Sequence, residues 1–296
     1  MKQYTKFLHT AVLATSALGL GAASISAGEV VPMPAPVPEC GTPGWTFTAA
    51  ALYLKSYQAS SSESLESWEG GTYDGDFDWG FRGSIGYERP DGLFFRLVGF
   101  WWEGDHDYKY DGRDSDERFT PRVGGKTKAY SFDLLVGDTF CPTENTSIEI
   151  SAGLRYAKLE QSTTWDDVND GFGFRGTYDT EFDGWGPTLQ IRTRRTLTDR
   201  WGLYADFQQS FLFGESELRD REGFFEDGDE EEFFDDKFSS DSLAAISEIR
   251  GGIEYLWGWN RIQNAYVRLG AEGQYWWVDS EDLGLVGGHL EVGFTF

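Results

Sequence analysis

Apolar and polar side chains alternate with a period of two along most of this chain from Trp45 onward. In residues 77–88, Phe, Trp, Phe, Gly, Ile and Tyr alternate with Asp, Gly, Arg, Ser, Gly and Glu. Such alternation is typical of a β-strand with one apolar and one polar face. The pattern predicts ten strands, over residues 46–55, 77–88, 93–103, 128–139, 147–159, 184–194, 200–213, 244–257, 264–277 and 285–296.

The links between these predicted strands are alternately long and short. Transmembrane barrels have short periplasmic turns, longer extracellular loops and an even number of strands. We therefore predict an all-β fold, a transmembrane antiparallel up-and-down β-barrel of about ten strands. The alternative is twelve strands, if the links at 104–127 and 214–242 each contain an additional one. The short links cover residues 89–92, 140–146, 195–199 and 258–263, the long ones cover 56–76, 104–127, 160–183 and 214–243, and 278–284 is intermediate.

The composition agrees with a wall one residue thick. Aromatic residues make up 17% of the chain and glycine accounts for 37 of 296 residues, where a globular core would favour Leu, Ile and Val. Tryptophans also gather at the predicted strand ends, as in the aromatic girdles of membrane proteins. These are Trp45, Trp79, Trp101, Trp102, Trp185, Trp201, Trp257, Trp276 and Trp277.

The N-terminal residues resemble an export signal. Lys2 and Lys6 precede an apolar stretch, and small residues at 25–27 offer a cleavage point, so we expect a signal peptide over 1–27. Residues 28–44 form a Pro-rich lead, which we place in the periplasm because alternating proline cannot join a strand ladder. The barrel is expected over 45–296, in the outer membrane of a Gram-negative-type envelope.

The formal net charge of −25 argues against nucleic acid as a partner, because its binders need basic surfaces that displace counterions. The final strand ends on Phe296, which resembles the assembly signal of bacterial outer-membrane proteins. We therefore expect outer-membrane lipid and the barrel-assembly machinery as partners. The oligomeric state is left open.

Three stretches resemble the Legionella-type major outer-membrane protein family, a group of pore-forming barrels. They are residues 79–87 (WGFRGSIGY), 182–187 (FDGWGP) and 269–277 (LGAEGQYWW) continuing to Phe296. The resemblance spans most of the chain and consists of pattern and spacing, without a catalytic motif. It implies a pore-forming outer-membrane protein and carries over no functional residues. The acidic stretch at 214–242 and the Pro-rich lead depart from the family pattern.

Charged residues of both signs recur on the polar faces of the predicted strands. The interior of a ten-stranded barrel is narrow, and an unpaired buried charge is costly. These side chains therefore line either a narrow ion pathway or a salt-bridged plug, and the sequence leaves both open. They are Arg82, Arg96, Asp133, Glu149, Arg155, Arg192, Asp206, Glu248, Arg250, Glu254, Arg268, Glu272 and Glu291.

The link at 214–242 is the most acidic part of the chain. A solvated, self-repelling loop is the first interpretation. The alternative is a site for a divalent cation, because hard carboxylate oxygens suit Ca²⁺ or Mg²⁺, although no EF-hand spacing occurs. No other cofactor is expected. The carboxylates concerned are Glu226, Asp227, Asp229, Glu230, Glu231, Glu232, Asp235 and Asp236.

The two cysteines, Cys40 and Cys141, fall on the same side of the predicted topology. An exported chain meets an oxidising compartment, so we predict that they form a disulfide, which would draw the lead across the periplasmic mouth. Neither cysteine has the spacing of a metal site.

An enzyme is the least favoured interpretation. Some ten-stranded barrels are proteases that use Asp and His at the outer rim, and His106 stands between Asp105 and Asp107. Because carboxylates are so abundant here, such neighbours are expected by chance. We predict that the chain is not an enzyme.

The sequence thus favours a pore that gives small ions or solutes a narrow diffusion pathway. Acidic outer loops would focus a negative potential at its mouth and favour cations. The alternative is a closed barrel that displays its acidic loops for adhesion or surface structure.

Overall fold

The computed structural model describes residues 43–59, 71–110, 122–169, 172–226, 229–259, 262–278 and 282–296. The chain divides into two units, Met1–Val37 and Pro38–Phe296, and the described residues all belong to the second. The expected signal peptide and nearly all of the expected lead lie outside the described residues.

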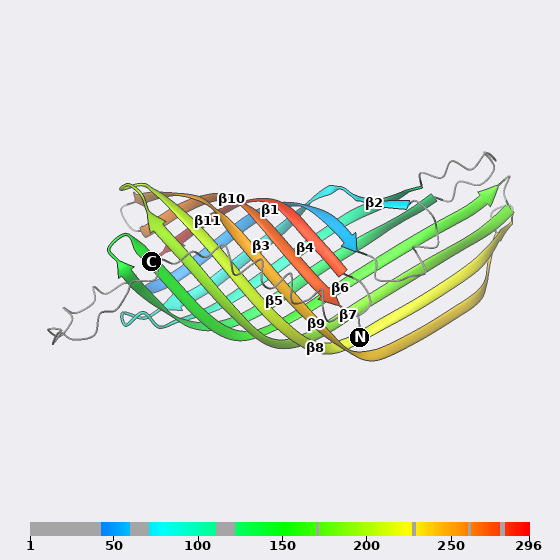
Figure 1. Cartoon of the computed structure of the whole chain (residues 1–296), viewed down its shortest axis with the longest axis horizontal. Coiled ribbons are helices and arrows are strands. Elements are labelled where there is room, and N and C mark those ends of the chain that lie inside the picture. Colours follow the sequence, from blue (N-terminus) through cyan, green and yellow to red (C-terminus); the bar gives the residue numbers. More distant parts are fainter. Residues whose placement is uncertain are drawn as a thin grey trace, which may run out of the picture. The chain divides into compact units, whose positions relative to one another are not determined.

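All elements in the described residues are β-strands, and every strand pairs antiparallel with its neighbours (Figure 1). β1 pairs with β11 and β4 pairs with β5, so that the sheet closes on itself. The strands are β1 (Gly44–Ala59), β2 (Gly71–Gly75), β3 (Phe77–Glu88), β4 (Phe94–Tyr110), β5 (Arg122–Thr143), β6 (Thr146–Asn169), β7 (Phe172–Thr196), β8 (Trp201–Glu226), β9 (Asp229–Trp259), β10 (Ile262–Val278) and β11 (Asp282–Thr295).

Two of these elements, β2 and β3, are parts of one barrel strand. Both pair with β4, with Gly75 opposite His106 and Gly80 opposite Trp102, and only Asp76 separates them. The barrel therefore has ten strands, which confirms the predicted fold class.

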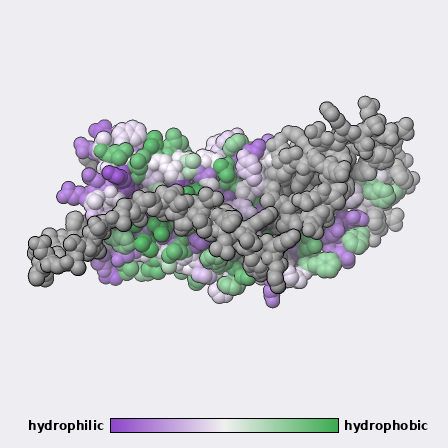
Figure 2. Space-filling view, viewed as in Figure 1, coloured by the Kyte–Doolittle hydropathy of each residue, from purple (hydrophilic) through white to green (hydrophobic). Residues whose placement is uncertain are grey.

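The predicted alternation sorts the side chains between the two faces of the wall. On β3, Trp79, Phe81 and Ile85 point outward and are exposed, whereas Arg82 points inward and is buried. Figure 2 shows hydrophobic side chains gathered on the outside of the wall. An apolar exterior around a closed ladder is what a lipid bilayer requires, because every backbone group is paired within the sheet.

Four strands run far beyond the predicted bounds at one end of the barrel (Figure 1, green and yellow strands). β6, β7, β8 and β9 have 24, 25, 26 and 31 residues, and a tilted strand needs only about 9–11 to cross a membrane. The long loops predicted at 160–183 and 214–243 are therefore wrong. Most of these residues continue the β6–β7 and β8–β9 ladders, and parts of 104–127 likewise extend β4 and β5.

The extended sheet is the part of β6–β9 formed by residues 158–183 and 214–243. The extended end is the end of the barrel that bears it. The turn end is the opposite one, where short links join the strands and the backbones of Trp45 and Phe296 form two hydrogen bonds, of 3.2 and 3.0 Å.

Candidate functional site

The inward-facing side chains form two layers along the barrel. The layer nearer the turn end consists mainly of arginine, carboxylate and amide side chains, with a few apolar ones such as Leu135 among them. The next layer toward the extended end consists of apolar side chains, and buried polar ones such as Thr127 and Gln161 follow beyond it. Strand alternation places both sets inside, because each strand directs every second residue to the interior. The barrel interior is the candidate functional site.

A chain of ion pairs crosses the polar layer. Arg155 donates to both oxygens of Asp133, at 2.5 and 2.8 Å, and to Glu248 at 2.5 Å. Arg82 donates to both oxygens of Glu272, at 2.8 and 2.5 Å, and to Glu248 at 3.3 Å. Because β9 is adjacent to neither β3 nor β6, the two bonds to Glu248 run across the interior rather than along the wall.

A second cluster lies nearer the turn end. Glu149 accepts from Arg96 at 2.9 Å and lies 3.6 Å from Arg192. Asp206 accepts from Arg192 at 3.1 Å and pairs with Arg250 at 3.1 Å. Three arginines thus share two carboxylates in this cluster.

A third cluster is centred on Arg268. Its guanidinium donates to Glu254 at 2.9 Å and to Glu291 at 3.0 Å, and it lies over the Tyr204 ring with a centroid distance of 4.7 Å. Arg194 completes the cluster with an ion pair of 2.5 Å to Glu254. Each carboxylate here is held by arginine.

One histidine joins the network. The hydroxyl of Tyr204 and Nε2 of His289 form a hydrogen bond of 2.6 Å, and Nδ1 of His289 lies 3.5 Å from Glu272. Both rings are buried.

The structure brings all thirteen predicted lumen residues into these clusters. Sequence reasoning missed Arg194, Tyr204 and His289, although each lies two residues from a predicted member on the same strand face. The period-two signal that found Arg192, Asp206 and Glu291 would therefore have found them too. With Arg194 included, seven arginines face seven carboxylates, so the polar layer is close to neutral.

The apolar layer fills the interior on the side of the ion pairs that faces the extended end. Its largest members, Trp102 and Trp276, are completely buried, and Phe100 packs against Trp276 with ring centroids 6.3 Å apart. Arg82 lies over the Phe100 ring at 5.2 Å, which joins the two layers. The layer consists of Ala50, Leu52, Leu54, Phe100, Trp102, Ala129, Ala157, Leu159, Phe182, Leu212, Ala244, Ile246, Trp276, Val278, Leu283 and Leu285.

The chain matches the family model described as the Legionella pneumophila major outer membrane protein precursor over residues 36–282. The chain belongs to this family. Its place is therefore the outer membrane, as the sequence predicted. No curated protein matches the chain.

This family member is similar to several solved structures. The Escherichia coli outer membrane protease OmpT has a TM-score of 0.51 at 10% identity, over 86% of this chain and 97% of OmpT. A major outer membrane protein from Thermus thermophilus has a TM-score of 0.37 at 14% identity, over 85% of this chain and 99% of that protein. Pseudomonas aeruginosa OprG has a TM-score of 0.34 at 11% identity over 85% and 97%.

The acidic stretch of this family member is a hairpin of β8 and β9 rather than a solvated loop. Asp235 accepts two hydrogen bonds from Arg219, at 2.8 and 2.6 Å, and these bonds lower the pKa of Asp235. Asp236 lies next to it on β9. The described residues contain no group of three or more His, Cys, Asp or Glu that could hold a metal ion. The other predicted carboxylates, at 226, 227 and 229–232, have side chains outside the described residues.

The remaining predicted residues lie at the two ends of the barrel. Cys141 is disulfide-bonded, and Cys40 lies outside the described residues, so the proposed pairing stays a prediction. His106 is buried on β4, and Asp105 points to the opposite face of that strand and is exposed. Phe296 packs near Phe47 and Phe294 at the closing seam of the barrel.

Proposed function

We propose that this outer-membrane barrel is closed to ions in the conformation described, and that it acts by presenting the extended sheet beyond the membrane. The observation that supports the proposal is the apolar layer. Nine of the ten barrel strands contribute to it, and its side chains are at most 6% exposed. The tenth strand contributes Gly80, which packs against Trp102.

An ion can cross the barrel only if groups in the interior replace the water molecules that it loses. An ion that enters the polar layer meets paired charges, but an ion that enters the apolar layer loses water without gaining a partner. Hydrophobic constrictions in channels stop ions in this way. The ion pairs from β9 to β3 and β6 also cross the interior, but they lie in the polar layer, where an entering ion meets charged groups.

The extended sheet supports a role at the surface. Its outer face is ordered by cross-strand ion pairs, including Lys237 with Glu217 and Arg221 with Asp179, each at 2.6 Å. Opposite charges on neighbouring strands stabilise a β-sheet. A rigid, charged sheet can present a fixed surface for adhesion or surface structure, which a set of mobile loops cannot.

A narrow, cation-preferring pore is the second candidate. The observation that favours it is the number of charged side chains inside the barrel, since a purely structural interior could be apolar throughout. Pairing leaves this interior close to neutral, so cation preference would have to come from the acidic surface outside. The pore also requires the apolar layer to move aside.

Single-channel conductance of the refolded protein in a planar bilayer distinguishes the two candidates. For the closed barrel we expect the parent to be silent, and Trp102→Ala combined with Trp276→Ala to give discrete conducting steps. Trp101→Ala is the matched control, because Trp101 is the neighbouring residue on the lipid-facing side. Heat-modifiable gel mobility would verify folding. Cation-preferring steps from the parent in a KCl gradient would overturn the proposal and establish the pore.

We also propose that the chain is not an enzyme. The likeness to OmpT is one of fold at 10% identity. His106 is buried, and strand alternation directs Asp105 away from it, so these two residues do not form the carboxylate–imidazole pair considered above.

A further inference from the structure

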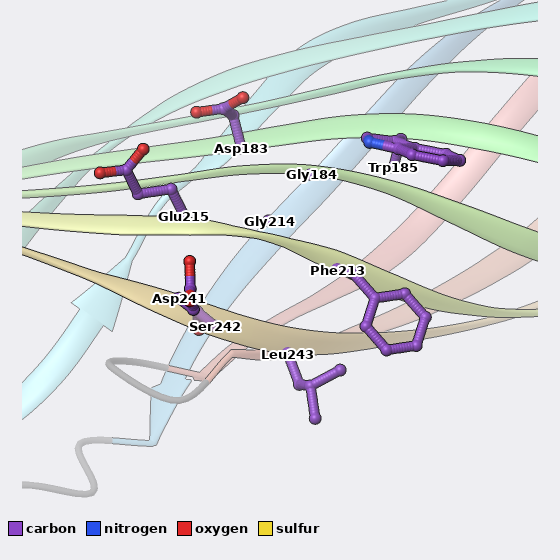
Figure 3. A pocket seen from close by; sticks show the side chains of 9 residues that line it. All are labelled: Asp183, Gly184, Trp185, Phe213, Gly214, Glu215, Asp241, Ser242 and Leu243. Carbon is purple, nitrogen blue, oxygen red and sulfur yellow. The ribbon is translucent and has the colours of Figure 1, made fainter.

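A depression of about 740 Å³ lies on the outer wall of the barrel, across β7, β8 and β9 at the base of the extended sheet (Figure 3). Two short rows of side chains line it. Trp185, Phe213 and Leu243 form an apolar row, in which neighbours are opposite each other in the ladder. The three apolar side chains are 66%, 60% and 47% exposed.

An acidic row lies two residues farther toward the extended end. Asp183 is opposite Glu215, and Glu215 is opposite Asp241, so three carboxylates occupy adjacent strands in register. Figure 3 shows these carboxylates on one side of the depression and the apolar side chains on the other. The depression is thus amphipathic along the strand direction.

A pair of glycines forms the floor between the rows. Gly184 and Gly214 are opposite each other, and a Cβ on Gly214 would overlap the backbone of Asp183 and Gly184. Only glycine permits this close approach of the β7 and β8 backbones.

The acidic row differs from the rest of the outer face of the extended sheet, because two of its carboxylates have no partner in the part of the chain that the structure describes. The other acidic positions with described side chains are paired, for example Glu217 with Lys237 and Asp235 with Arg219. Glu215 and Asp241 form no ion pair or hydrogen bond with any described residue. Lys158 on β6 is opposite Asp183 at one end of the row, but among the described residues no lysine or arginine is opposite Glu215 or Asp241. Like charges directly opposite each other destabilise a sheet, so these two carboxylates lack a cation.

The row lies where the apolar exterior ends. On the neighbouring strands β5 and β6 the first charged outward residue beyond the aromatic ones is a lysine, Lys128 or Lys158, whereas on β7, β8 and β9 it is a carboxylate. The described carboxylates are not grouped as a metal site. An organic cation attached to an apolar chain fits both rows at once.

We propose that this depression binds a membrane lipid whose head group carries a primary ammonium group. The ammonium group lies between Glu215 and Asp241, where its N–H groups donate to both carboxylates. The acyl chain lies on Trp185, Phe213 and Leu243. The lipid supplies the cation that Glu215 and Asp241 lack.

Native mass spectrometry of the detergent-purified barrel tests this proposal, with phosphatidylethanolamine and phosphatidylglycerol as the probes. We expect the parent to retain phosphatidylethanolamine. The double variant Glu215→Gln/Asp241→Asn neutralises both carboxylates that accept from the ammonium group. It should retain the lipid at least roughly tenfold less, because losing one charge-assisted hydrogen bond already has about that effect. The control Glu217→Gln/Asp235→Asn changes the charge equally on the same strands, at carboxylates that already have partners, and should behave as the parent.

Three results would overturn the proposal. The first is equal retention of phosphatidylethanolamine by the parent and Glu215→Gln/Asp241→Asn. The second is equal retention of both lipids by the parent. The third is retention of phosphatidylglycerol that depends on Ca²⁺ and disappears with a chelator, which would indicate that a metal ion bridges the carboxylates to a phosphate.

Discussion

The two layers of the barrel interior both fill the space inside the wall, one with paired charges and the other with apolar side chains. In the polar layer every charge must find a partner, and Glu248 does so by binding Arg82 and Arg155 from two other parts of the wall. In the apolar layer Trp102 and Trp276 need only fill space. The polar layer therefore depends on particular pairs, whereas the apolar layer depends on volume.

This difference separates stability from closure. Buried ion pairs contribute little net stability, but they are costly to break because an unpaired charge remains behind. An apolar layer excludes water and ions whatever its detailed packing. We therefore expect substitutions in the polar layer to destabilise the barrel most, and removal of large side chains from the apolar layer to open it as well.

The largest expected effect follows from removing one arginine of the polar layer. Arg155→Ala leaves Asp133 and Glu248 without their principal partner, and we expect a loss of about 3–5 kcal/mol in the free energy of unfolding. Urea-induced unfolding of the barrel in lipid vesicles measures this loss. Arg89→Ala removes an exposed ion pair with Asp91 and should cost no more than about 1 kcal/mol. Equal losses for Arg155→Ala and Arg89→Ala would contradict the structural role of the network.

The sequence could predict the polar layer because its residues alternate with apolar ones. Arg82 lies between Phe81 and Gly83, and period two identifies its face without any knowledge of its partner. The partner is not predictable in the same way. Arg82 and Glu248 are separated by 166 positions and lie on strands that are not adjacent, so only closure of the barrel brings them together.

The apolar layer escaped prediction because there both faces of the strands are apolar. Residues 50–54 read Ala-Ala-Leu-Tyr-Leu, and Trp101-Trp102 and Trp276-Trp277 place one tryptophan on each side of the wall. Loss of alternation inside a strand was the available signal for a filled interior. The strands of the extended sheet were not predicted for the opposite reason, because both faces of this sheet are largely polar and show no alternation.

The second effect concerns the volume of the apolar layer. Leu212→Ala removes a completely buried side chain, and we expect a loss of about 2–4 kcal/mol in the free energy of unfolding, because a cavity remains. Leu203→Ala is the matched control on the same strand, where the side chain is outward and lipid can fill the space. The same urea titration measures both variants. Equal losses for Leu203→Ala and Leu212→Ala would show that lost volume costs no more in the apolar layer than on the lipid-facing side.

The smallest expected effect lies outside the membrane, in the ion pairs of the extended sheet. Arg219 lowers the pKa of Asp235 below its usual value of 3.8. The ionised carboxylate is favoured in the folded chain, so the pair stabilises the β8–β9 hairpin above that usual value and is lost as pH falls through the lowered pKa. Arg219→Gln should return the pKa of Asp235 toward 3.8 while leaving global unfolding almost unchanged, because exposed pairs contribute little.

NMR titration of the Asp235 carboxyl carbon, with amide hydrogen exchange across the hairpin, measures this effect. The parent should keep hairpin protection to a lower pH than Arg219→Gln, and protection in the polar and apolar layers should not differ between the two. If both proteins lose hairpin protection at the same pH, the ion pairs do not order the extended sheet. Its rigidity would then have to come from the backbone ladder alone, and so would any fixed surface that it presents.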